Sequence, residues 1–341
     1  ARRPRVALLA TGDELVLPGS PLGPDQIVAS NSFGLRPMLL PYAETVMDHG
    51  IAQDTRAALR DKLSAILDTG PDIVITTGGA SVGERDLVQE LLLELGAGAG
   101  RLTQRYNGWE RIVLLDYSRT QLQQARERLG DSDNFIYVAA DIYKLPFVNG
   151  LCDGATMIRT LHHMADAPQT LQSVRRVLAQ DSLFLLEFAN KRNLKSIFRW
   201  LLRKQAWSPF SPEQVEFVEL NYNFHPKTIL ATLQQSGFSP LESLGVSLFR
   251  SNWFKNHVTH ERLVQWDARF QNKEPFKGLT PSIFTVNRAV GPSETPAQGS
   301  FFSCPICATS LPETKATQVC PGCSHEWQYS QGIYEFRINP E

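Results

Sequence analysis

Short apolar runs alternate with helical patterns in the first 90 residues of the chain. The apolar runs at 6–10 and 73–77 predict strands, and the spacing of apolar positions over 32–40 and 55–67 predicts helices. Alternation of this kind is typical of a parallel α/β layer.

The same alternation continues over residues 91–288 and predicts a second, larger α/β layer. Strands are expected near residues 111–116, 135–139, 153–158, 183–188 and 241–249. Helices are expected near residues 118–129, 168–179, 193–205 and 226–236. The helix over 193–205 has a basic face, which we interpret as solvated surface, with contact to an acidic substrate or a membrane surface as the alternatives.

Residues 91–118 carry the most informative pattern in the chain. One apolar run ends on Glu94, a turn with glycine at every second position of 96–100 follows, and the next apolar run ends on Asp116. Glycine lets the backbone approach a ligand without Cβ interference. An acid that closes the next strand can accept hydrogen bonds from both ribose hydroxyls. Because the turn lacks the G-x-G-x-x-G spacing of dinucleotide sites, the expected ligand is a nucleoside.

The order and spacing of these motifs resemble class I S-adenosylmethionine-dependent methyltransferases over about residues 90–250. In that family the first motif wraps the methionine part of the cofactor, and the next acids bind ribose and adenine. The segment Leu161-His162-His163 matches one that is common in small-molecule methyltransferases of the ubiquinone/menaquinone type. The resemblance implies a cofactor site formed by Glu94, Gly96, Ala97, Gly98, Gly100, Asp116, Tyr117, Asp141 and Ile142.

Each of these residues also has a structural interpretation. The glycines could form a bare turn, Asp116 could cap the helix that begins at 118, and Asp141 could be a turn residue. His162 and His163 are the candidates for catalysis, although one of them could instead hold a backbone carbonyl. The sulfonium already makes the methyl carbon electrophilic, so the protein mainly has to align a nucleophile and exclude water.

Four sequence blocks between residues 5 and 89 resemble a different family. They are VALLATGDEL, QIVASN, GIAQD and GGASVGERD, beginning at residues 6, 26, 50 and 78. They are similar to the molybdopterin-binding domain of gephyrin-like molybdenum insertases. The resemblance implies loops that close over the pterin phosphate, carboxylates near molybdate, and molybdopterin and Mg²⁺ as further candidate ligands. The implied residues are Thr11, Gly12, Asp13, Glu14, Asp54, Gly78, Gly79, Ser81, Gly83 and Asp86.

The two resemblances meet at residues 86–96. The insertase-like pattern makes this segment a helix, whereas the methyltransferase pattern needs a buried strand that begins at Leu91. Leu and Glu favour a helix, but we predict that the helix ends near Leu91 and that the strand begins there. The later insertase motifs do not follow, so insertase activity is not expected. We infer that the chain joins parts of two unrelated proteins, by natural fusion, an error in the gene assignment or engineering.

Two C-x-x-C pairs, separated by twelve residues, follow a Pro/Gly/Ser-rich linker over 290–300. Two such turns can direct four thiolates at one tetrahedral Zn²⁺, and metal binding would fold a module this small. The ligands are Cys304, Cys307, Cys320 and Cys323. The segment resembles a zinc ribbon with a structural or protein-binding role. Two disulfides or a redox motif are the alternatives, and His325 could replace one ligand.

Composition narrows the function classes further. The chain has 341 residues, of which 42% are hydrophobic and 20% charged, and its net charge is −1. That charge argues against a broad nucleic-acid surface. No apolar stretch approaches the roughly 20 residues of a transmembrane helix. Four of the five cysteines form two C-x-x-C pairs and Cys152 stands alone, which predicts a metal site in a reducing compartment. We therefore expect a cytoplasmic protein.

Taken together, these patterns predict an α/β protein with a Rossmann-like methyltransferase sheet. Residues 1–90 form a partial molybdopterin-binding-type domain, 91–289 the methyltransferase domain, 290–300 a linker and 301–341 the ribbon. The predicted function is methyl transfer from S-adenosylmethionine to a small-molecule acceptor. The alternatives are molybdenum cofactor biosynthesis through the first segment, and an inactive fusion whose ribbon recruits a protein partner.

Overall fold

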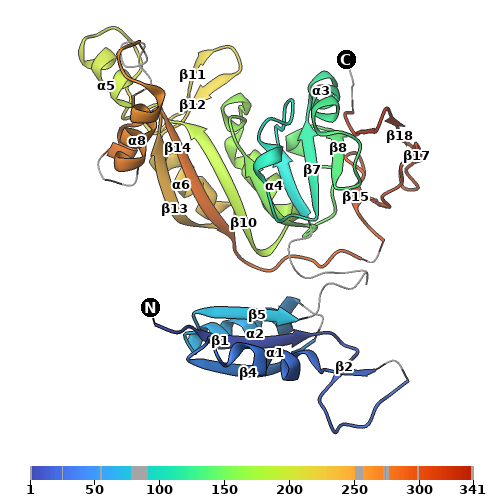
Figure 1. Cartoon of the computed structure of the whole chain (residues 1–341). Coiled ribbons are helices and arrows are strands. Elements are labelled where there is room, and N and C mark those ends of the chain that lie inside the picture. The colour runs from blue at the N-terminus through green and yellow to red at the C-terminus, as the bar shows by residue number, and fades with distance from the viewer. Residues whose placement is uncertain are drawn as a thin grey trace. The chain divides into compact units, whose positions relative to one another are not determined.

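The chain divides into two compact units, residues 1–90 and 91–341 (Figure 1). The computed structural model describes residues 2–24, 26–53, 56–77, 91–249, 256–271, 273, 276–297 and 299–338. No helix among these residues is long and apolar enough to cross a membrane.

The small unit is a three-stranded parallel sheet, with the order β4-β1-β5, that carries two helices. Its elements are β1 (Arg5–Thr11), α1 (Asn31–Leu39), β4 (Thr45–Ala52), α2 (Arg56–Asp68) and β5 (Ile73–Thr77). A short parallel pair, β2 (Leu15–Val16) and β3 (Ile27–Val28), follows β1. The predicted α/β layer is therefore confirmed. The pattern missed β4, because Asp48 and His49 interrupt its apolar run.

The large unit is built on a nine-stranded sheet with the order β13-β14-β10-β9-β6-β7-β8-β20-β19. Its parallel centre consists of β6 (Leu91–Leu95), β7 (Arg111–Asp116), β8 (Phe135–Ala139), β9 (Cys152–Met157) and β10 (Leu178–Ala189). At one side β14 (Ser282–Ala289) and β13 (Phe238–Val246) continue the sheet in antiparallel register. The Rossmann-like α/β fold is therefore present, and the sheet is mixed.

The central strand β6 begins at Leu91, as predicted, and all five of its residues are buried. The helix expected to end near Leu91 lies outside the described residues. It lies between β7 and β9, so both of its edges are paired. Leu91, Leu93 and Leu95 face one core cluster, and Leu92 faces the other. Burial on both faces of a parallel sheet therefore overrides the helical preference of Leu and Glu.

Five helices connect the strands of the large unit in the described residues. They are α3 (Arg119–Leu129), α4 (Ala167–Val177), α5 (Leu194–Leu201), α6 (Pro226–Gln235) and α8 (His260–Phe270). Of these, α3 and α6 pack directly on the sheet, and α4 packs against α6. The predicted helix over 193–205 ends at Leu201, and β14 was not predicted at all. A two-stranded hairpin, β11 (Val215–Val218) and β12 (Asn221–Asn223), follows α5 in the sequence.

The cysteine-bearing module is part of the large unit's core. Its strand β20 (Ile333–Glu335) pairs in parallel with β8, and β19 (Tyr329–Ser330) pairs with β20. Phe302 is fully buried, and its ring packs between those of Phe147 and Phe336 at centroid distances of 5.8 and 4.7 Å. The module therefore covers an edge strand that would otherwise expose unpaired backbone groups.

This packing predicts that Phe302→Ala destabilises the whole large unit, because it opens a cavity shared by the module and the sheet. The expected loss is about 3–5 kcal/mol in the free energy of unfolding, measured by urea denaturation. Phe217→Ala, at a ring that is 57% exposed, is the matched control and should cost little. A Phe302 variant whose sheet unfolds at the unchanged urea concentration would contradict the shared core.

Candidate cofactor site and metal centre

The glycine turn lies at the carboxyl end of β6 and is fastened to β7. The amides of Gly96 and Ala97 both donate to the Leu115 carbonyl, at 2.8 and 3.0 Å. The amide of Gly98 donates to the Asp116 carboxylate at 2.9 Å. The carboxyl ends of parallel strands are where α/β sheets bind ligands, so the turn and the acid occupy the expected edge.

The three glycines answer different steric demands. A Cβ on Gly96 would lie 2.1 Å from the Thr160 hydroxyl oxygen, and one on Gly100 would lie 2.9 Å from Leu129 Cδ1. A Cβ on Gly98 would come no closer than 3.7 Å to another atom, the amide oxygen of Gln121. Gly96 and Gly100 are thus needed for packing, whereas Gly98, whose φ is +55°, leaves open space beside the turn.

The Asp116 carboxylate is held by the backbone and keeps the capacity to bind a ligand. One oxygen accepts from Gly98, and the other accepts from the Ser118 amide at 2.8 Å. Each carboxylate oxygen has two lone pairs, so each can accept one further hydrogen bond. The N-cap of α3 is Ser118.

A cavity of about 510 Å³ opens beside the turn. That volume lies within the usual range of small-molecule sites. Its lining includes the turn residues Gly96–Ala99, together with Glu94, Tyr106, Thr156, Arg159, His162 and His163. Asp116, Tyr117, Asp141 and Ile142 do not line this cavity. The structure thus brings the methionine-side candidates together around one space, with Asp116 one hydrogen bond away.

The two residues expected at the adenine lie on a short helical turn. The Asp141 carboxylate accepts from the Tyr143 amide at 2.9 Å and caps the 3₁₀ turn Ile142–Lys144. Ile142 is buried in the core. The structural interpretation of Asp141 as a turn residue therefore describes its contact, and its role at the adenine stays a prediction. Tyr117 is exposed, and the Arg337 guanidinium lies 5.5 Å from its ring centre.

Glu94 is a buried carboxyl at the floor of the cavity. The Thr103 hydroxyl donates to it at 2.6 Å. Burial raises the pKa of Glu94 to about 7, against the hydrogen bonds from Thr103 and Tyr106. Burial likewise raises the pKa of the Tyr106 hydroxyl to about 12. Sequence reasoning missed Tyr106 and Arg159, because neither belongs to a motif; position after a strand end was the signal available for Arg159.

The two histidines lie against each other at the cavity wall, with ring centres 4.0 Å apart and ring planes tilted by 45°. Burial lowers the pKa of His162 to about 4, so its imidazole is neutral near pH 7. Nδ1 of His163 lies 3.1 Å from the Leu220 carbonyl oxygen. That contact matches the expectation that one histidine holds a backbone carbonyl. A neutral imidazole at His162 can line an apolar substrate site without adding charge.

The four paired cysteines form one cluster. Their sulfur atoms all lie within 4.8 Å of one another, and the closest pairs are Cys307–Cys320 at 3.5 Å and Cys304–Cys323 at 3.7 Å. Tetrahedral Zn–S bonds of about 2.3 Å place sulfurs about 3.8 Å apart, so the cluster fits zinc. Hydrogen bonds from Thr309 lower the pKa of Cys307 to about 6.

His325 and Cys152, the other two candidates considered with the cysteine pairs, do not belong to this cluster. The ring of His325 packs against that of Trp327, with ring centres 4.2 Å apart and ring planes tilted by 54°. Cys152 is fully buried, and burial raises the pKa of its thiol, so it packs as a small apolar group as expected.

The structure describes only part of the expected molybdopterin site in the small unit. Thr11 ends β1, and the loop over Gly12, Asp13 and Glu14 follows it, with the Gly12 amide donating to the Ala52 carbonyl at 3.2 Å. The remaining predicted residues lie outside the described part of the chain. They are Asp54, Gly78, Gly79, Ser81, Gly83 and Asp86.

Two protein families match this chain. Residues 93–186 match the methyltransferase domain family, and residues 7–109 match a family described as probable molybdopterin binding domain. The matches overlap over 93–109, the segment that follows the meeting point of the two sequence patterns.

Curated relatives divide in the same way. Molybdopterin molybdenumtransferase of Nostoc sp. is 44% identical over 96 residues, which cover 28% of this chain and 22% of that protein. The ubiquinone/menaquinone biosynthesis C-methyltransferase of Chromobacterium violaceum is 26% identical over 227 residues, covering 63% of this chain and 78% of that protein. The 2-phytyl-1,4-naphtoquinone methyltransferase of Trichormus variabilis is 28% identical over 160 residues, covering 44% of this chain and 69% of that protein. The chain therefore spans about a fifth of the first of these relatives.

Solved structures resemble the chain at low sequence identity and with TM-scores below 0.5. A chain of the complex between the Haloferax volcanii Trm112 methyltransferase activator and a methyltransferase has a TM-score of 0.42 at 17% identity, covering 60% of this chain and 85% of that one. An S-adenosylmethionine-dependent methyltransferase of Listeria monocytogenes has a TM-score of 0.43 at 14% identity, covering 61% and 93%.

The motifs, the sheet and the family matches agree on the class of the larger part. The chain carries a class I S-adenosylmethionine-dependent methyltransferase domain, with a segment of the molybdopterin-binding domain family before it and a four-cysteine module after it.

Glu94 predicts a pH dependence of stability. Its pKa is about 7 in the folded protein against an ordinary 4.5, so between these pH values the folded state binds more protons than the unfolded state. The free energy of unfolding should therefore fall as pH rises from about 4.5 to 7, by on the order of 3 kcal/mol. Urea denaturation across this range measures the slope. Glu94→Gln should flatten it, and Glu127→Gln on the exposed side of α3 should not; equal slopes in both variants would refute the assignment.

The cysteine cluster predicts that chelation destabilises the large unit. Because the module shares the sheet's core, losing even about 2 kcal/mol should lower Tm by about 4–8 °C for a unit of this size. Differential scanning calorimetry with and without a chelator measures the shift, and metal analysis should find one zinc per chain. A double variant, Cys307→Ser with Cys320→Ser, should not respond to chelator; an unchanged Tm of the unsubstituted chain would contradict the zinc site.

Proposed function

We propose that the large unit transfers a methyl group from S-adenosylmethionine to a small-molecule acceptor. The observation that carries this proposal is the hydrogen bond between the Gly98 amide and the Asp116 carboxylate at the edge of the 510 Å³ cavity. It sets the turn that would wrap the methionine part beside the acid that would bind the ribose, as one nucleoside ligand requires.

The residues would divide the work as follows. Asp116 would accept hydrogen bonds from the ribose hydroxyls through its remaining lone pairs, and Asp141 would meet the adenine amino group. Gly98 and Ala99 would leave room for the methionine chain, and Glu94 would face its ammonium group. The bound cofactor supplies an electrophilic methyl group. The chain therefore needs only to orient the acceptor and keep water out.

The acceptor side of the cavity supports a small aromatic molecule. The neutral His162 and the Tyr106 ring border it, and such rings pack well on an aromatic face. Two relatives at 26% and 28% identity are named as methyltransferases of ubiquinone/menaquinone biosynthesis and of a phytyl-naphthoquinone. A quinone-type ring is therefore the first acceptor class to assay.

Isothermal titration calorimetry with S-adenosylhomocysteine tests the cofactor part of the proposal. We expect one site per chain, and Asp116→Ala should weaken binding by about a hundredfold to ten-thousandfold, because two charge-assisted hydrogen bonds of about 1.5–3 kcal/mol each are lost.

The matched control is Asp131→Ala, which removes an exposed carboxylate paired with Arg126 at the far end of α3. This variant should bind S-adenosylhomocysteine as the unsubstituted chain does. Absence of binding to the zinc-loaded chain, or equal affinity in both aspartate variants, would rule out the proposed site.

A second candidate function rests on the small unit. Its 44% identity to a molybdopterin molybdenumtransferase supports molybdopterin binding through the loop over Thr11–Glu14. Because the match covers 22% of that relative, we propose binding alone for this segment.

A further inference from the structure

Helix α5 turns its apolar side chains toward solvent. Leu194, Phe198, Leu201 and Leu202 are 42%, 56%, 60% and 63% exposed. Their spacing of i, i+4, i+7 and i+8 places them on one stripe of the helix. The inward side of the helix carries the buried Ser196 and the half-buried Ile197. An amphipathic helix of a folded protein ordinarily buries a stripe of this kind, whereas these four side chains remain 42–63% exposed among the described residues.

Cations accompany the stripe. Lys195 and Arg199, one helical turn apart, are both exposed and lie beside Leu194 and Phe198. Residues 192–212 contain five basic residues and no acidic one, although the whole chain has a net charge of −1. The basic residues are Arg192, Lys195, Arg199, Arg203 and Lys204. The exposed face of α5 is therefore both apolar and positively charged.

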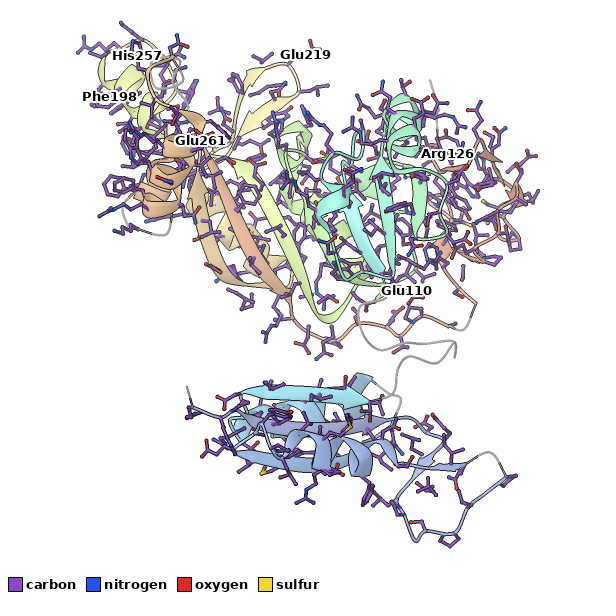
Figure 2. All side chains as sticks on the ribbon, in the orientation of Figure 1. Glu110, Arg126, Phe198, Glu219, His257 and Glu261 are labelled. Carbon is purple, nitrogen blue, oxygen red and sulfur yellow. The ribbon has the colours of Figure 1, made fainter. Side chains whose placement is uncertain are left out.

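The β11–β12 hairpin, which follows α5 in the sequence, carries a second group of exposed apolar residues. Phe217, Val218 and Leu220 on β11 and its turn are all more than half exposed. Phe198 on α5 and Glu219 at the hairpin turn both lie at the end of the large unit toward which β10 runs (Figure 2). The hairpin's acids, Glu216 and Glu219, confine the cationic part of the face to α5.

Hydrogen bonds fix this face at the margin of the cofactor cavity. The buried Lys191, three residues before α5, donates to the Glu213 carbonyl at 2.6 Å, at the base of the hairpin. The ring of Trp200 packs edge-on against Phe210, at 5.6 Å between ring centres. On the other side, the Leu220 carbonyl oxygen lies 3.1 Å from Nδ1 of His163, which lines the cavity.

We infer that α5 and the β11–β12 hairpin bind the surface of an anionic lipid bilayer. A short helix with an exposed apolar stripe and flanking cations lies in the interface, with its apolar side chains among the acyl chains and its cations at the headgroups. The negative charge of the headgroups matches the α5 part of this face, where residues 192–212 have five cations and no acid, whereas Glu216 and Glu219 lie on the hairpin. This inference goes beyond the proposed methyl transfer and does not depend on it.

Co-sedimentation of the full chain with vesicles tests the inference. Phosphatidylcholine vesicles that contain phosphatidylserine should bind the chain, and phosphatidylcholine alone should bind it weakly. Phe198→Ser with Leu201→Ser should abolish binding. Lys195→Gln with Arg199→Gln should weaken it by about tenfold or more, and added salt should reduce the difference.

Matched controls come from equally exposed positions elsewhere. Met38→Ser with Leu67→Ser, at side chains 69% and 63% exposed, controls for lost apolar surface, and Arg128→Gln with Lys227→Gln controls for lost charge. Both control pairs should bind vesicles normally. Titration with S-adenosylhomocysteine and circular dichroism check that the α5 variants fold. If the unsubstituted chain does not bind S-adenosylhomocysteine, that result counts against the proposed methyl transfer and leaves the membrane inference untouched.

Three outcomes would overturn the inference. They are absence of binding to phosphatidylserine vesicles, binding that survives the Phe198 and Leu201 substitutions, and a concentration-dependent dimer in ultracentrifugation that these substitutions dissociate. The last result would make α5 an interface between two copies of the chain.

Discussion

The site depends on one constraint, which is that β6 stays buried between β7 and β9. Both of its edges are paired and all five of its residues are buried, so pairing with β7 and β9 strongly specifies the register in which the strand ends. Its last residue leads directly into the glycine turn, and the Leu115 carbonyl fastens that turn to β7. The Asp116 carboxylate then reaches the Gly98 amide. Sheet register thus determines the distance between the two halves of the proposed cofactor site.

The cysteine module extends the same sheet at the edge beyond β8. Strand β20 pairs with β8, and the Phe336 amide donates to the carbonyl of Ala139, the last residue of β8. Arg337 in turn contacts the carbonyl and ring of Tyr117, next to Asp116. These contacts couple the module to the end of the sheet where the proposed ribose and adenine contacts lie, so metal binding by its cysteines would act on that end as well.

Sequence patterns were sufficient for the parallel centre of the sheet and for the residues around the glycine turn, because buried parallel strands are continuous apolar runs. They were insufficient for β14 and β20. Polar residues alternate with apolar ones in β14, whose Thr285 and Asn287 are buried with partners supplied by the fold. Strand β20 has three residues, and only pairing with β8 defines it. The outward stripe of α5 was also hidden, because periodicity marks an apolar face but not the direction in which that face points.

The central claim is that the turn at 96–100 and the acid at 116 bind one ligand together. Hydrogen–deuterium exchange of the zinc-loaded chain, with and without S-adenosylhomocysteine, tests it most directly. The account predicts that peptides covering residues 94–100 and 116–121 gain protection together at the same ligand concentration. Protection of one peptide without the other, or of neither, would contradict a shared site.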